Sequence, residues 1–492
     1  MNVQALANSV EALEAEWIAL GIYENETEPP QSVLGTSLGN LLSTLFQTKD
    51  LTGDLGSTSA LYGVAGVAAR SVLVFGLGRR EQYSSGSAFS AGVAVSKRLA
   101  TKGRGAVAVV LPEPGEDDAL AASLVEGLVV GTRGVDIRKR EASRHPFTTL
   151  HIVKPSLSTD LTSLSAAIDR GVVVGEAINL ARDLANTPPA EKKPSVLASR
   201  ARLLAMENGI GVELWDENRI KVERFGGLLG VASGSAEPPS FVVLEYQNGD
   251  QSPTLALVGK GVTFDSGGLS LKPSASMEDM KSDMTGAAVV LATMIAIARL
   301  KLRVNVRGYL ALTENMTGGG AMKLGDVLTM RDGTTVEVMN TDAEGRLILA
   351  DALSYAVERK PGVVIDLATL TGACLVALGP KIAGLFANDD ALSDALLAAC
   401  KRNGERAWRL PLDPDFKEAL KSPVADLKNL GGKWGGAITA AKFLEHFVGE
   451  TPWAHLDIAG PSWNDSATSL YDEGGTGCFV RTLVSFIASR AV

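Results

Sequence analysis

Cysteine and histidine are scarce in this chain of 492 residues. It has three cysteines, far apart at positions 374, 400 and 478, and four histidines. Three scattered cysteines exclude a disulfide framework and a CxxC metal pair. Four histidines leave almost no room for a histidine-rich zinc site. Any metal chemistry in this protein must therefore use carboxylates, alone or with a less usual ligand.

Long apolar runs and an excess of basic charge are absent as well. The longest apolar run, residues 286–298, is too short to span a bilayer. The N-terminal residues are acidic and lack a long apolar core, unlike a secretory signal. With 47 basic and 56 acidic residues, the formal net charge is -9, which opposes binding to a polyphosphate strand. We therefore expect a soluble, cytoplasmic protein that does not bind membranes and has no nucleic acid as its main partner.

The composition is that of an ordinary globular protein. Hydrophobic residues make up 46% of the chain and charged residues 21%, with 52 glycines, which excludes disorder, collagen and coiled coil. A length of 492 residues predicts two or three domains. We place one boundary near residue 165, which divides the chain into a smaller N-terminal domain (residues 1–165) and a larger C-terminal domain (residues 166–492).

Apolar runs that alternate with helical patterns predict an α/β fold in both domains. In the N-terminal domain, residues 71–76 and 106–111 are predicted as buried strands, with a helix of small residues at 86–99. A helical pattern through Val172 and Leu184 follows. In the C-terminal domain, the predicted strands are residues 240–245, 254–259, 304–313, 334–339, 363–367 and 453–458, and the predicted helices are 286–299, 347–359, 391–402 and 438–448. Strands that are apolar throughout and alternate with helices are typical of a mostly parallel sheet flanked by helices.

Polar residues gather in the C-terminal domain where predicted strands end. An apolar strand runs into Lys260, and Asp265 follows five residues later beside two glycines. Lys272 lies just beyond them. In a second stretch, Asp283 stands directly before an apolar helix. Ligands bind outside the carboxyl ends of strands in open α/β sheets, so these positions are candidates for a functional site.

A third polar stretch, residues 340–347, lies between a predicted strand and a predicted helix. Asp342, Glu344 and Arg346 occupy alternate positions in it, so in an extended segment they point to one side. Because this stretch also follows a strand, we expect it at the same edge of the sheet as the first.

Four carboxylates, those of Asp265, Asp283, Asp342 and Glu344, are therefore expected to converge in one pocket. Without compensation they would repel and raise one another's pKa. Divalent cations resolve that repulsion, because hard cations take oxygen ligands. Two cations about 3.5–4 Å apart can lower the pKa of a water and clamp a scissile carbonyl or phosphoryl group.

Each feature also has an ordinary structural explanation. An aspartate ahead of a helix serves as an N-cap, an acidic pair there complements the helix dipole, and lysines are by default solvated. These explanations do not account for three such loops at one sheet edge. The GxSxG match at residues 35–39 lacks a convincing strand before it, and Asp457 follows His455, which is the wrong order for a serine hydrolase. We expect His455, in an apolar strand, to be a hydrogen-bonded structural residue.

The third stretch, Asn340-Thr-Asp-Ala-Glu-Gly-Arg-Leu347, resembles the signature of the leucyl aminopeptidases, the cytosol aminopeptidase family (peptidase family M17). The similarity extends to residues 258–268, the segment around Asp283, Ala368-Thr-Leu-Thr-Gly-Ala373, residues 377–379 and 383–388, and 453–460 (WAHLDIAG). These highly specific motifs cover about residues 170–492. The N-terminal domain resembles the family only loosely, as is usual for its variable domain, and we expect it to serve oligomerisation or regulation.

The resemblance implies a ligand role for five residues. It implies that Asp265 and Glu344 bridge two divalent metal ions, Mn or Zn, with Mg also suited to oxygen ligands. Lys260 and Asp283 then complete the more exchangeable site, and Asp342 completes the other. A lysine ligand must be neutral, which burial beside two cations enforces.

The resemblance also implies the reaction, removal of N-terminal amino acids from peptides. A metal-bridging hydroxide attacks the first peptide bond of a substrate whose free α-amine binds a metal. Lys272 polarises the scissile carbonyl and, together with metal, stabilises the oxyanion of the tetrahedral intermediate. Arg346 holds a bicarbonate-like anion that acts as a proton shuttle. The assembly implied is a homohexamer, a dimer of trimers.

The side-chain pocket of the family is apolar. Met280, Thr369, Gly372 and Ala459 occupy the matching positions here, which suits Leu-like N-terminal residues. Ser462 stands where some relatives carry a larger apolar residue, a change that bears on the depth of the pocket.

Two other classes of function use the same residues. Another two-metal hydrolase, such as a phosphoesterase, predicts cleavage of a phosphoester and indifference to a free amine. A non-catalytic binding protein on the same fold is expected to have lost a ligand or Lys272, whereas all seven matched positions are intact. We therefore predict a metallo-aminopeptidase that acts on peptides with a free N-terminus.

Overall fold

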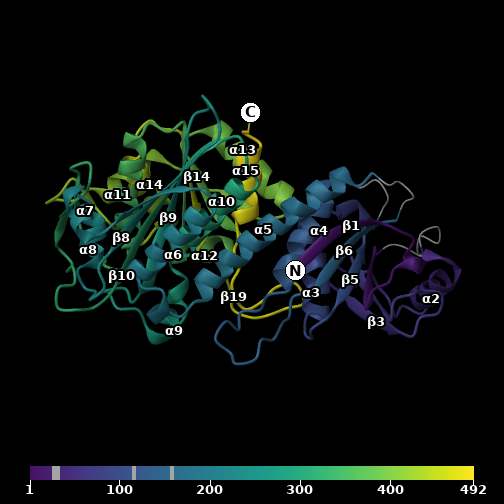
Figure 1. Cartoon of the computed structure of the whole chain (residues 1–492). Helices are drawn as coiled ribbons and strands as arrows, with labels where there is room; N and C mark the ends of the chain where they lie inside the picture. The colour runs from purple at the N-terminus through teal and green to yellow at the C-terminus, as the bar shows by residue number, and fades with distance from the viewer. Residues whose placement is uncertain (25–33, 113–117, 156–159, 492) are drawn as a thin grey trace. The chain divides into compact units, whose positions relative to one another are not determined.

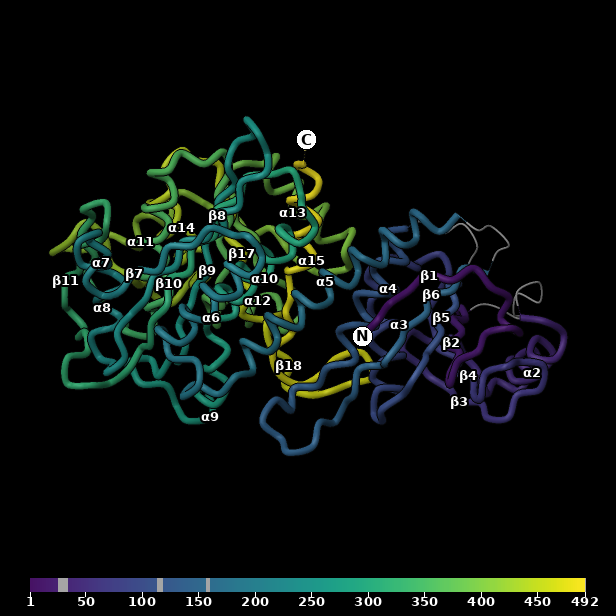
Figure 2. Tube along the Cα trace, in the orientation of Figure 1, coloured from purple at the N-terminus to yellow at the C-terminus, as the bar shows by residue number. Residues whose placement is uncertain are grey.

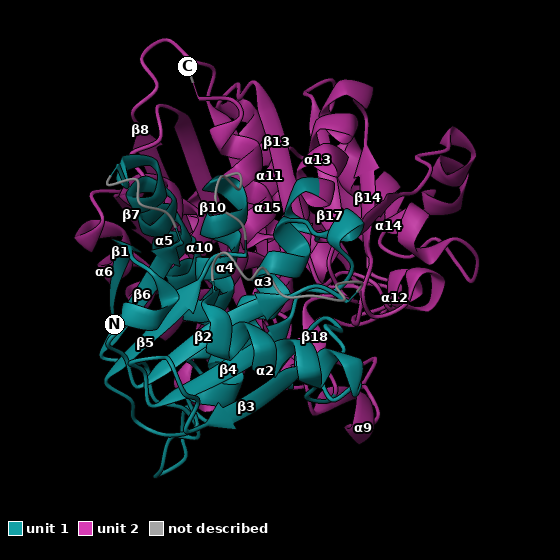
Figure 3. Ribbon diagram, turned by 90° about the vertical axis from the view of Figure 1, so that its right-hand side faces the viewer, with its two compact units in different colours: residues 1–179, 402–404, 466–473 teal, residues 180–401, 405–465, 474–492 magenta. Residues whose placement is uncertain are grey.

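The computed structural model describes residues 1–24, 34–112, 118–155 and 160–491 (Figure 1). The chain packs into two compact units (Figure 3). Unit 1 comprises residues 1–179, 402–404 and 466–473, and unit 2 comprises residues 180–401, 405–465 and 474–492. The division falls within the long helix α5 (Thr162–Asn186). These units are defined by packing, and the domain boundary near residue 165 stays a prediction.

Unit 1 is built on a six-stranded sheet in the order β1-β6-β5-β2-β4-β3. Its strands are β1 (Asn2–Ala7), β2 (Trp17–Ile22), β3 (Thr58–Tyr62), β4 (Ser71–Gly76), β5 (Ala106–Val110) and β6 (Thr149–Lys154). Every neighbouring pair is parallel except β3 and β4. The strands predicted at 71–76 and 106–111 are thereby confirmed as β4 and β5.

Helices cover both faces of this sheet. The helices of unit 1 are η1 (Val10–Ala12), α2 (Thr36–Gln47), η2 (Arg80–Gln82), α3 (Ser85–Leu99), α4 (Asp118–Gly131) and the first part of α5. The predicted helix at 86–99 is confirmed as α3, which packs beside α4 (Figure 1). The two helices approach closely at Gly92, which has no side chain. A Cβ at this position would lie 2.3 Å from the carbonyl oxygen of Leu124. Leu38 and Leu42 of α2 are buried in a second core on the opposite face.

Unit 2 is built on an eight-stranded sheet in the order β15-β14-β17-β13-β9-β10-β8-β7. Its strands are β7 (Gly211–Trp215), β8 (Ser240–Gln247), β9 (Leu255–Asp265), β10 (Asn305–Asn315), β13 (Val363–Ala368), β14 (Ala383–Ala387), β15 (Ala407–Arg409) and β17 (Trp453–Asp457). The pairs β17–β13, β13–β9, β9–β10 and β14–β15 are parallel, and the other three are antiparallel. Strands β8, β9 and β10 run side by side (Figure 2). The predicted α/β class is confirmed, with a parallel centre and antiparallel flanks.

The strand predicted at 334–339 forms β12 (Thr335–Glu337), but it does not belong to the main sheet. It pairs with β11 (Val327–Thr329) and β16 (Leu427–Lys428) in a separate three-stranded sheet. Only Val336 of β12 is buried, so this strand faces a core on one side alone, unlike the central strands. The expectation that the 340–347 stretch follows a strand of the main sheet was therefore wrong.

The remaining helices of unit 2 lie around its sheets. They are η3 (Pro189–Glu191), α6 (Pro194–Glu207), α7 (Glu217–Val222), α8 (Gly226–Ala232), α9 (Ser274–Met277), η4 (Met280–Ser282), α10 (Thr285–Arg299), α11 (Gly345–Glu358), α12 (Gly372–Leu378), α13 (Asp390–Asn403), η5 (Pro414–Leu420), α14 (Gly436–His446) and α15 (Val480–Ala488). The four helices predicted in this region are confirmed as α10, α11, α13 and α14. A two-residue pair, β18 (Trp463–Asn464) and β19 (Gly474–Gly475), completes the unit.

Helices α10 and α11 pack on opposite faces of β9. A Cβ on Gly259 would lie 2.6 Å from the Cα of Ala287 in α10, whereas a Cβ on Gly345 of α11 would lie 2.6 Å from the Cε of Lys260. Neighbouring residues of a strand point to opposite faces, so Lys260 faces α11. The N-terminus of α11 is what brings the 340–347 stretch to the end of β9.

The stretch Ser274–Arg299, which includes α10, is long and apolar enough to cross a membrane by length and composition. However, 89% of its most apolar window is buried inside the protein. A core helix of this kind meets the same criterion, so the apolar character of α10 is explained by its place against the sheet.

A buried polar pair joins β13 and β17. His455 and Asp366 are register partners, and the His455 Nδ1 lies 2.6 Å from the Asp366 Oδ1. The Nε1 of Trp453 donates to the other Asp366 oxygen at 2.7 Å. Burial alone would lower the pKa of His455, but Asp366 and Asp457 outweigh it and raise that pKa above its ordinary value. The interpretation of His455 as a hydrogen-bonded structural residue is confirmed.

Replacing His455 by glutamine is expected to lower the free energy of unfolding by about 3–5 kcal/mol near pH 6, because it breaks a buried charged pair. The folded-state pKa of His455 is raised. Its stabilisation is therefore fully present below the unfolded pKa of about 6.5 and is lost as pH rises through the folded value. Calorimetric melting of the unchanged protein and of His455→Gln between about pH 6 and pH 9 should show that the stability lost in the variant becomes smaller as pH rises. A deficit that grows with pH would contradict this assignment.

Candidate functional site

One cavity of about 470 Å³ at the carboxyl end of β9 contains most of the residues singled out from the sequence. Among the residues that line it are Lys260, Asp265, Lys272, Asp283, Asp342 and Glu344, together with Met280, Thr369, Gly372 and Ala459. Lys260 and Asp265 belong to β9 itself, Asp283 directly follows η4, and Asp342 and Glu344 precede α11. The structure therefore brings the three polar stretches into one place, although only one of them follows a strand of the main sheet.

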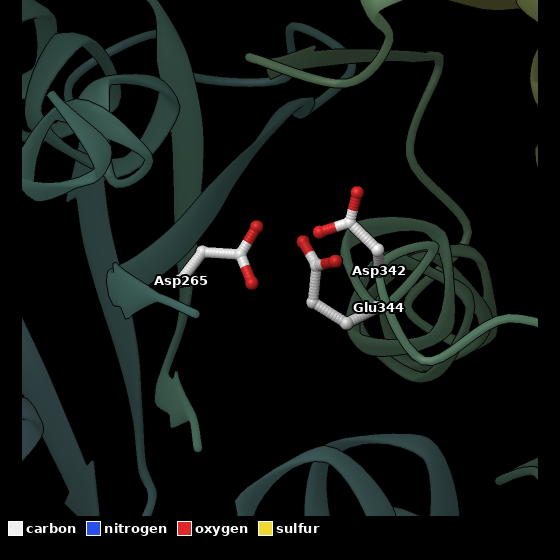
Figure 4. Close-up of side chains that lie close together, drawn as sticks. All are labelled: Asp265, Asp342 and Glu344. Atoms are coloured by element: carbon white, nitrogen blue, oxygen red, sulfur yellow. The ribbon is translucent and has the colours of Figure 1, made fainter. Parts of the chain in front are cut away.

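Three carboxylates form the centre of this cavity. Asp265, Asp342 and Glu344 each offer an oxygen within 4.8 Å of the others. Figure 4 shows Asp265 at the end of its strand, facing the other two across a common space. Asp265 and Glu344 are buried, and Asp342 is partly exposed.

Two lysines neutralise part of this negative charge. The Lys260 Nζ lies 2.8 Å from the Asp283 Oδ1 and 2.9 Å from the Glu344 Oε1, and it donates to the carbonyl oxygen of Thr369 at 3.0 Å. The Lys272 Nζ lies 2.9 Å from the Asp265 Oδ2 and also contacts Asp342. Neither lysine is the solvated surface residue of the ordinary explanation.

Burial and the neighbouring charges together shift the pKa values of these groups. Burial alone would lower the pKa of Lys260 and of Lys272, but the neighbouring carboxylates outweigh burial and raise both. Burial, reinforced by Asp265, raises the pKa of Glu344, of Asp283 and of Asp342 above the ordinary carboxyl range. The site thus holds more negative charge than its own lysines neutralise.

The N-cap explanation for Asp283 was wrong, because Met284 is the N-cap of α10. The side chain of Asp283 instead turns toward the cavity wall, where its Oδ1 accepts a hydrogen bond from the Thr369 Oγ1 at 2.7 Å. Its Oδ2 is buried and has no hydrogen-bond partner in the part of the chain that the structure describes.

The chemistry of these residues suits divalent cations. Besides the Asp283 Oδ2, the Glu344 Oε2 is a buried carboxylate oxygen without a hydrogen-bond partner among the described residues. An orphaned buried carboxylate oxygen is costly unless a cation satisfies it. Oxygen-rich donor sets of this kind suit Mn and Mg, and Zn also binds carboxylates.

Arg346 does not follow the geometry expected of an extended segment. Glu344 has helical backbone angles (φ -77°, ψ -35°) as the N-cap of α11, so Arg346 lies in the first turn of that helix. It is buried and is not among the residues that line the cavity. Burial lowers the pKa of the guanidinium to about 10, against the opposing effect of Glu344 and Asp457. Its Nε and one Nη have no hydrogen-bond partner within the described residues.

Asp457 organises the apolar wall of the cavity. Its carboxylate is buried and accepts hydrogen bonds from the Thr371 Oγ1 at 2.7 Å and from the backbone N–H groups of Leu370 and Ala459, each at 3.2 Å. This arrangement holds together the segments after β13 and β17, which carry Thr369, Gly372 and Ala459. Other residues that line the wall are Leu370, Leu375, Pro380, Ser462 and Trp463.

Two residues that support the site were missed from the sequence. Asn315 donates to Asp265, and Asn429 binds the backbone of the 340–343 loop. A polar residue at the end of an apolar strand is a signal that could have found Asn315. The segment around Asn429 carries no such signal, because its partner loop lies far away in the sequence.

Known proteins resemble this chain along nearly its whole length. The catalytic domain of the cytosol aminopeptidase family matches residues 179–484, and the N-terminal domain of the same family matches residues 19–137. A probable cytosol aminopeptidase of Rhodopirellula baltica is 42% identical over 461 residues, which cover 94% of this chain and 89% of the relative. Another, of Syntrophotalea carbinolica, is 42% identical over 484 residues, covering 96% and 97%.

Solved structures of similar proteins also match nearly the whole chain. The bottromycin maturation enzyme BotP in complex with Mn is 36% identical and superposes with a TM-score of 0.85, over 96% of this chain and 99% of that one. A mutant of tomato leucine aminopeptidase is 34% identical, with a TM-score of 0.88 over 99% of this chain and 96% of that one. The chain belongs to the cytosol aminopeptidase family.

Proposed function

We propose that this protein removes Leu-like N-terminal residues from peptides and uses two divalent metal ions to do so. Membership of the cytosol aminopeptidase family makes it a metal-dependent aminopeptidase, a hydrolase of peptide substrates. The single observation that carries the finer proposal is the shared cavity, where four carboxylates and two lysines meet beside an apolar wall. A phosphoesterase has no need of such an apolar wall.

The residues that would hold the cations are those of the carboxylate cluster and its neighbours. Asp265 and Glu344 would be ligands to both cations. Lys260 and Asp283 would complete the site of one cation, and Asp342 would complete the site of the other. The orphaned oxygens of Asp283 and Glu344 support this assignment. When bound, such a pair of cations lowers the pKa of a water and polarises a carbonyl group.

Lys272 and Arg346 supply the remaining polar groups. Lys272 lines the cavity with its ammonium beside Asp265, so it can donate a hydrogen bond to the scissile carbonyl and to the oxyanion that develops from it. Arg346 would hold a bicarbonate-like anion through the N–H groups that have no partner among the described residues, and so assist proton transfer.

The apolar wall would receive the side chain of the N-terminal residue. Met280, Ala459 and Leu375 line it, and the absence of side-chain bulk at Gly372 leaves room for a branched aliphatic group. Ser462 is 1% exposed and lines the same cavity, so the lining is small at this position. A Leu-like side chain suits this lining.

Further features of the proposal rest on the relatives. The Mn complex of BotP favours Mn among the candidate metals, with Zn and Mg as the other oxygen-compatible options. The name cytosol aminopeptidase, carried by both relatives above, favours a cytoplasmic location. We also propose the homohexamer that the family resemblance implies.

The test is hydrolysis of Leu-p-nitroanilide by protein that has been stripped with a chelator and reloaded with Mn²⁺ or Zn²⁺. We expect cleavage to be lost on stripping and restored by metal. N-acetyl-Leu-p-nitroanilide, which lacks the free amine, should remain uncleaved under all conditions. Cleavage of the acetylated substrate, or of p-nitrophenyl phosphate in place of the anilide, would contradict the aminopeptidase assignment and favour another two-metal hydrolase. No cleavage with any metal would favour a binding protein.

A further inference from the structure

A single buried asparagine binds most of the loop that carries two of the proposed ligands. Asn429 follows β16 and is completely buried. Its Oδ1 accepts from the backbone N–H of Met339 at 2.8 Å and of Asn340 at 3.3 Å. Its Nδ2 donates to the carbonyl oxygens of Asn340 at 2.7 Å and of Ala343 at 3.3 Å. An amide has two acceptor lone pairs and two donor hydrogens, so all of its capacity is spent on this loop.

A second buried asparagine binds a proposed ligand directly. Asn315, the last residue of β10, is 1% exposed. Its Nδ2 donates to the Asp265 Oδ1 at 2.8 Å and to the carbonyl oxygen of Thr341 at 2.9 Å. The backbone N–H of Gly267 donates to the same Asp265 oxygen at 2.9 Å. The Oδ1 is therefore held by two donors, which leaves the Oδ2 to face Lys272 and the cavity.

The two asparagines act on one assembly, because Asn315 ties the carboxylate of Asp265 to the loop that Asn429 holds. Residues 339–344, which include Asp342 and Glu344, form turns and irregular backbone rather than a regular element. Such a loop has no ladder of its own to resist the mutual repulsion of the buried carboxylates beside it. Neutral amide donors can hold it without adding a charge that would compete with a cation.

We propose that Asn315 and Asn429, together the amide frame, are positioning residues that preorganise the carboxylates for divalent cations. This inference rests on the proposed two-metal function. Neither asparagine lines the cavity, so the frame works through the ligands, as hydrogen bonds around metal ligands do in general. It fixes the 339–343 backbone through Asn429 and selects the free oxygen of Asp265 through Asn315.

The chain offers a matched control at the opposite end of the same strand. Asn305, the first residue of β10, accepts from the backbone N–H of Gly249 at 3.0 Å. It donates to the carbonyl oxygens of Ser252 at 2.9 Å and Asp250 at 3.4 Å. It thus makes the same kind of backbone bonds as the amide frame, far from the cavity along an eleven-residue strand.

The experiment compares Asn429→Ser, Asn315→Ser and Asn305→Ser, all of which remain neutral. Mn²⁺ binding to metal-stripped full-length protein is measured by titration calorimetry, beside the melting temperature of the stripped protein. We expect the dissociation constant for Mn²⁺ to rise by about 10- to 100-fold in the two frame variants. In Asn305→Ser we expect the dissociation constant for Mn²⁺ to stay within about 2-fold of that of the unchanged protein. This should hold even if the melting temperature of Asn305→Ser falls as far as that of the frame variants. At saturating Mn²⁺, KM for Leu-p-nitroanilide should be unchanged in the frame variants.

A folded frame variant that binds Mn²⁺ as tightly as the unchanged protein would overturn the inference, as would an equal loss in Asn305→Ser. If Asn429→Ser does not fold, Asn315→Ser decides, since it leaves the 339–343 backbone bonds of Asn429 in place. Failure of the proposed function looks different, because the unchanged protein would then bind no Mn²⁺ or cleave no Leu-p-nitroanilide. If the unchanged protein binds no Mn²⁺, the amide frame is refuted together with the proposed function. If it binds Mn²⁺ but cleaves no Leu-p-nitroanilide, the Mn²⁺ dissociation constants of the variants still test the amide frame.

Discussion

Changing Glu344 to glutamine is expected to lower kcat/KM for Leu-p-nitroanilide by more than about 100-fold, the upper end of what changes outside a ligand set cost. Glu344 is 1% exposed, its Oε1 lies 2.9 Å from the Lys260 Nζ, and its Oε2 has no hydrogen-bond partner among the described residues. An amide of the same shape keeps the packing but cannot carry the negative charge that a cation needs. We expect Mn²⁺ binding, measured by calorimetry, to weaken in parallel.

The stability of Glu344→Gln separates a ligand from a structural residue. Burial, reinforced by Asp265, raises the pKa of Glu344, which means that the fold disfavours its charged form. A neutral amide there should leave the melting temperature of the stripped protein equal or higher. Glu245→Gln is the matched control: Glu245 of β8 forms a surface pair with Arg307 of β10, and its replacement should change neither activity nor Mn²⁺ binding. Lost activity with a lower melting temperature and unaltered Mn²⁺ binding would assign Glu344 to the fold instead.

Local pattern was enough to predict the fold class, since apolar strands and small-residue helices carry their own periodicity. The strand at 71–76 and the helix α11 are examples that the structure confirms within a few residues. The membership of β12 could not be predicted in this way, because three residues with one buried side chain do not reveal which sheet they join. The partner strand β16 lies roughly ninety residues further along the chain.

For the candidate site too, local sequence was enough to find the charged residues, but it did not show how the fold brings them together. Three polar stretches expected at one sheet edge are more than ordinary capping and solvation explain, and they drew attention to Lys260, Asp265, Asp283, Asp342 and Glu344. Their convergence was expected for a partly mistaken reason, since α11 rather than a strand of the main sheet delivers two of them.

What the sequence could not reveal is the set of neutral groups that hold the charged ones. Asn429, a neutral amide, reaches its loop across more than eighty residues. Such contacts arise only when the sheet order places distant segments together. Charge is visible in a sequence, whereas the hydrogen bonds that orient it become visible only in the fold.

Changing Lys272 to methionine is expected to lower kcat by about 10²- to 10³-fold, the usual cost of removing one donor from a developing oxyanion. The side chain of Lys272 is 15% exposed and lines the cavity with its Nζ 2.9 Å from the Asp265 Oδ2. Methionine matches its length and apolar stem but donates no hydrogen bond. Because the donor acts mainly on the transition state, KM for Leu-p-nitroanilide should change little.

Metal binding distinguishes this role from that of Glu344. Lys272 pairs with Asp265 and Asp342, two of the residues proposed to hold a cation, so a cation and this ammonium compete for the same carboxylates. Lys272→Met should therefore bind Mn²⁺ at least as tightly as the unchanged protein while its kcat falls, the opposite of Glu344→Gln. Lys281→Met removes a nearby lysine that lies over the ring of Trp463 and does not line the cavity, and it should leave kcat unaltered. If Lys272→Met weakened Mn²⁺ binding and kcat together, Lys272 would be a group that orders the ligands, and the oxyanion would have to be stabilised by other donors.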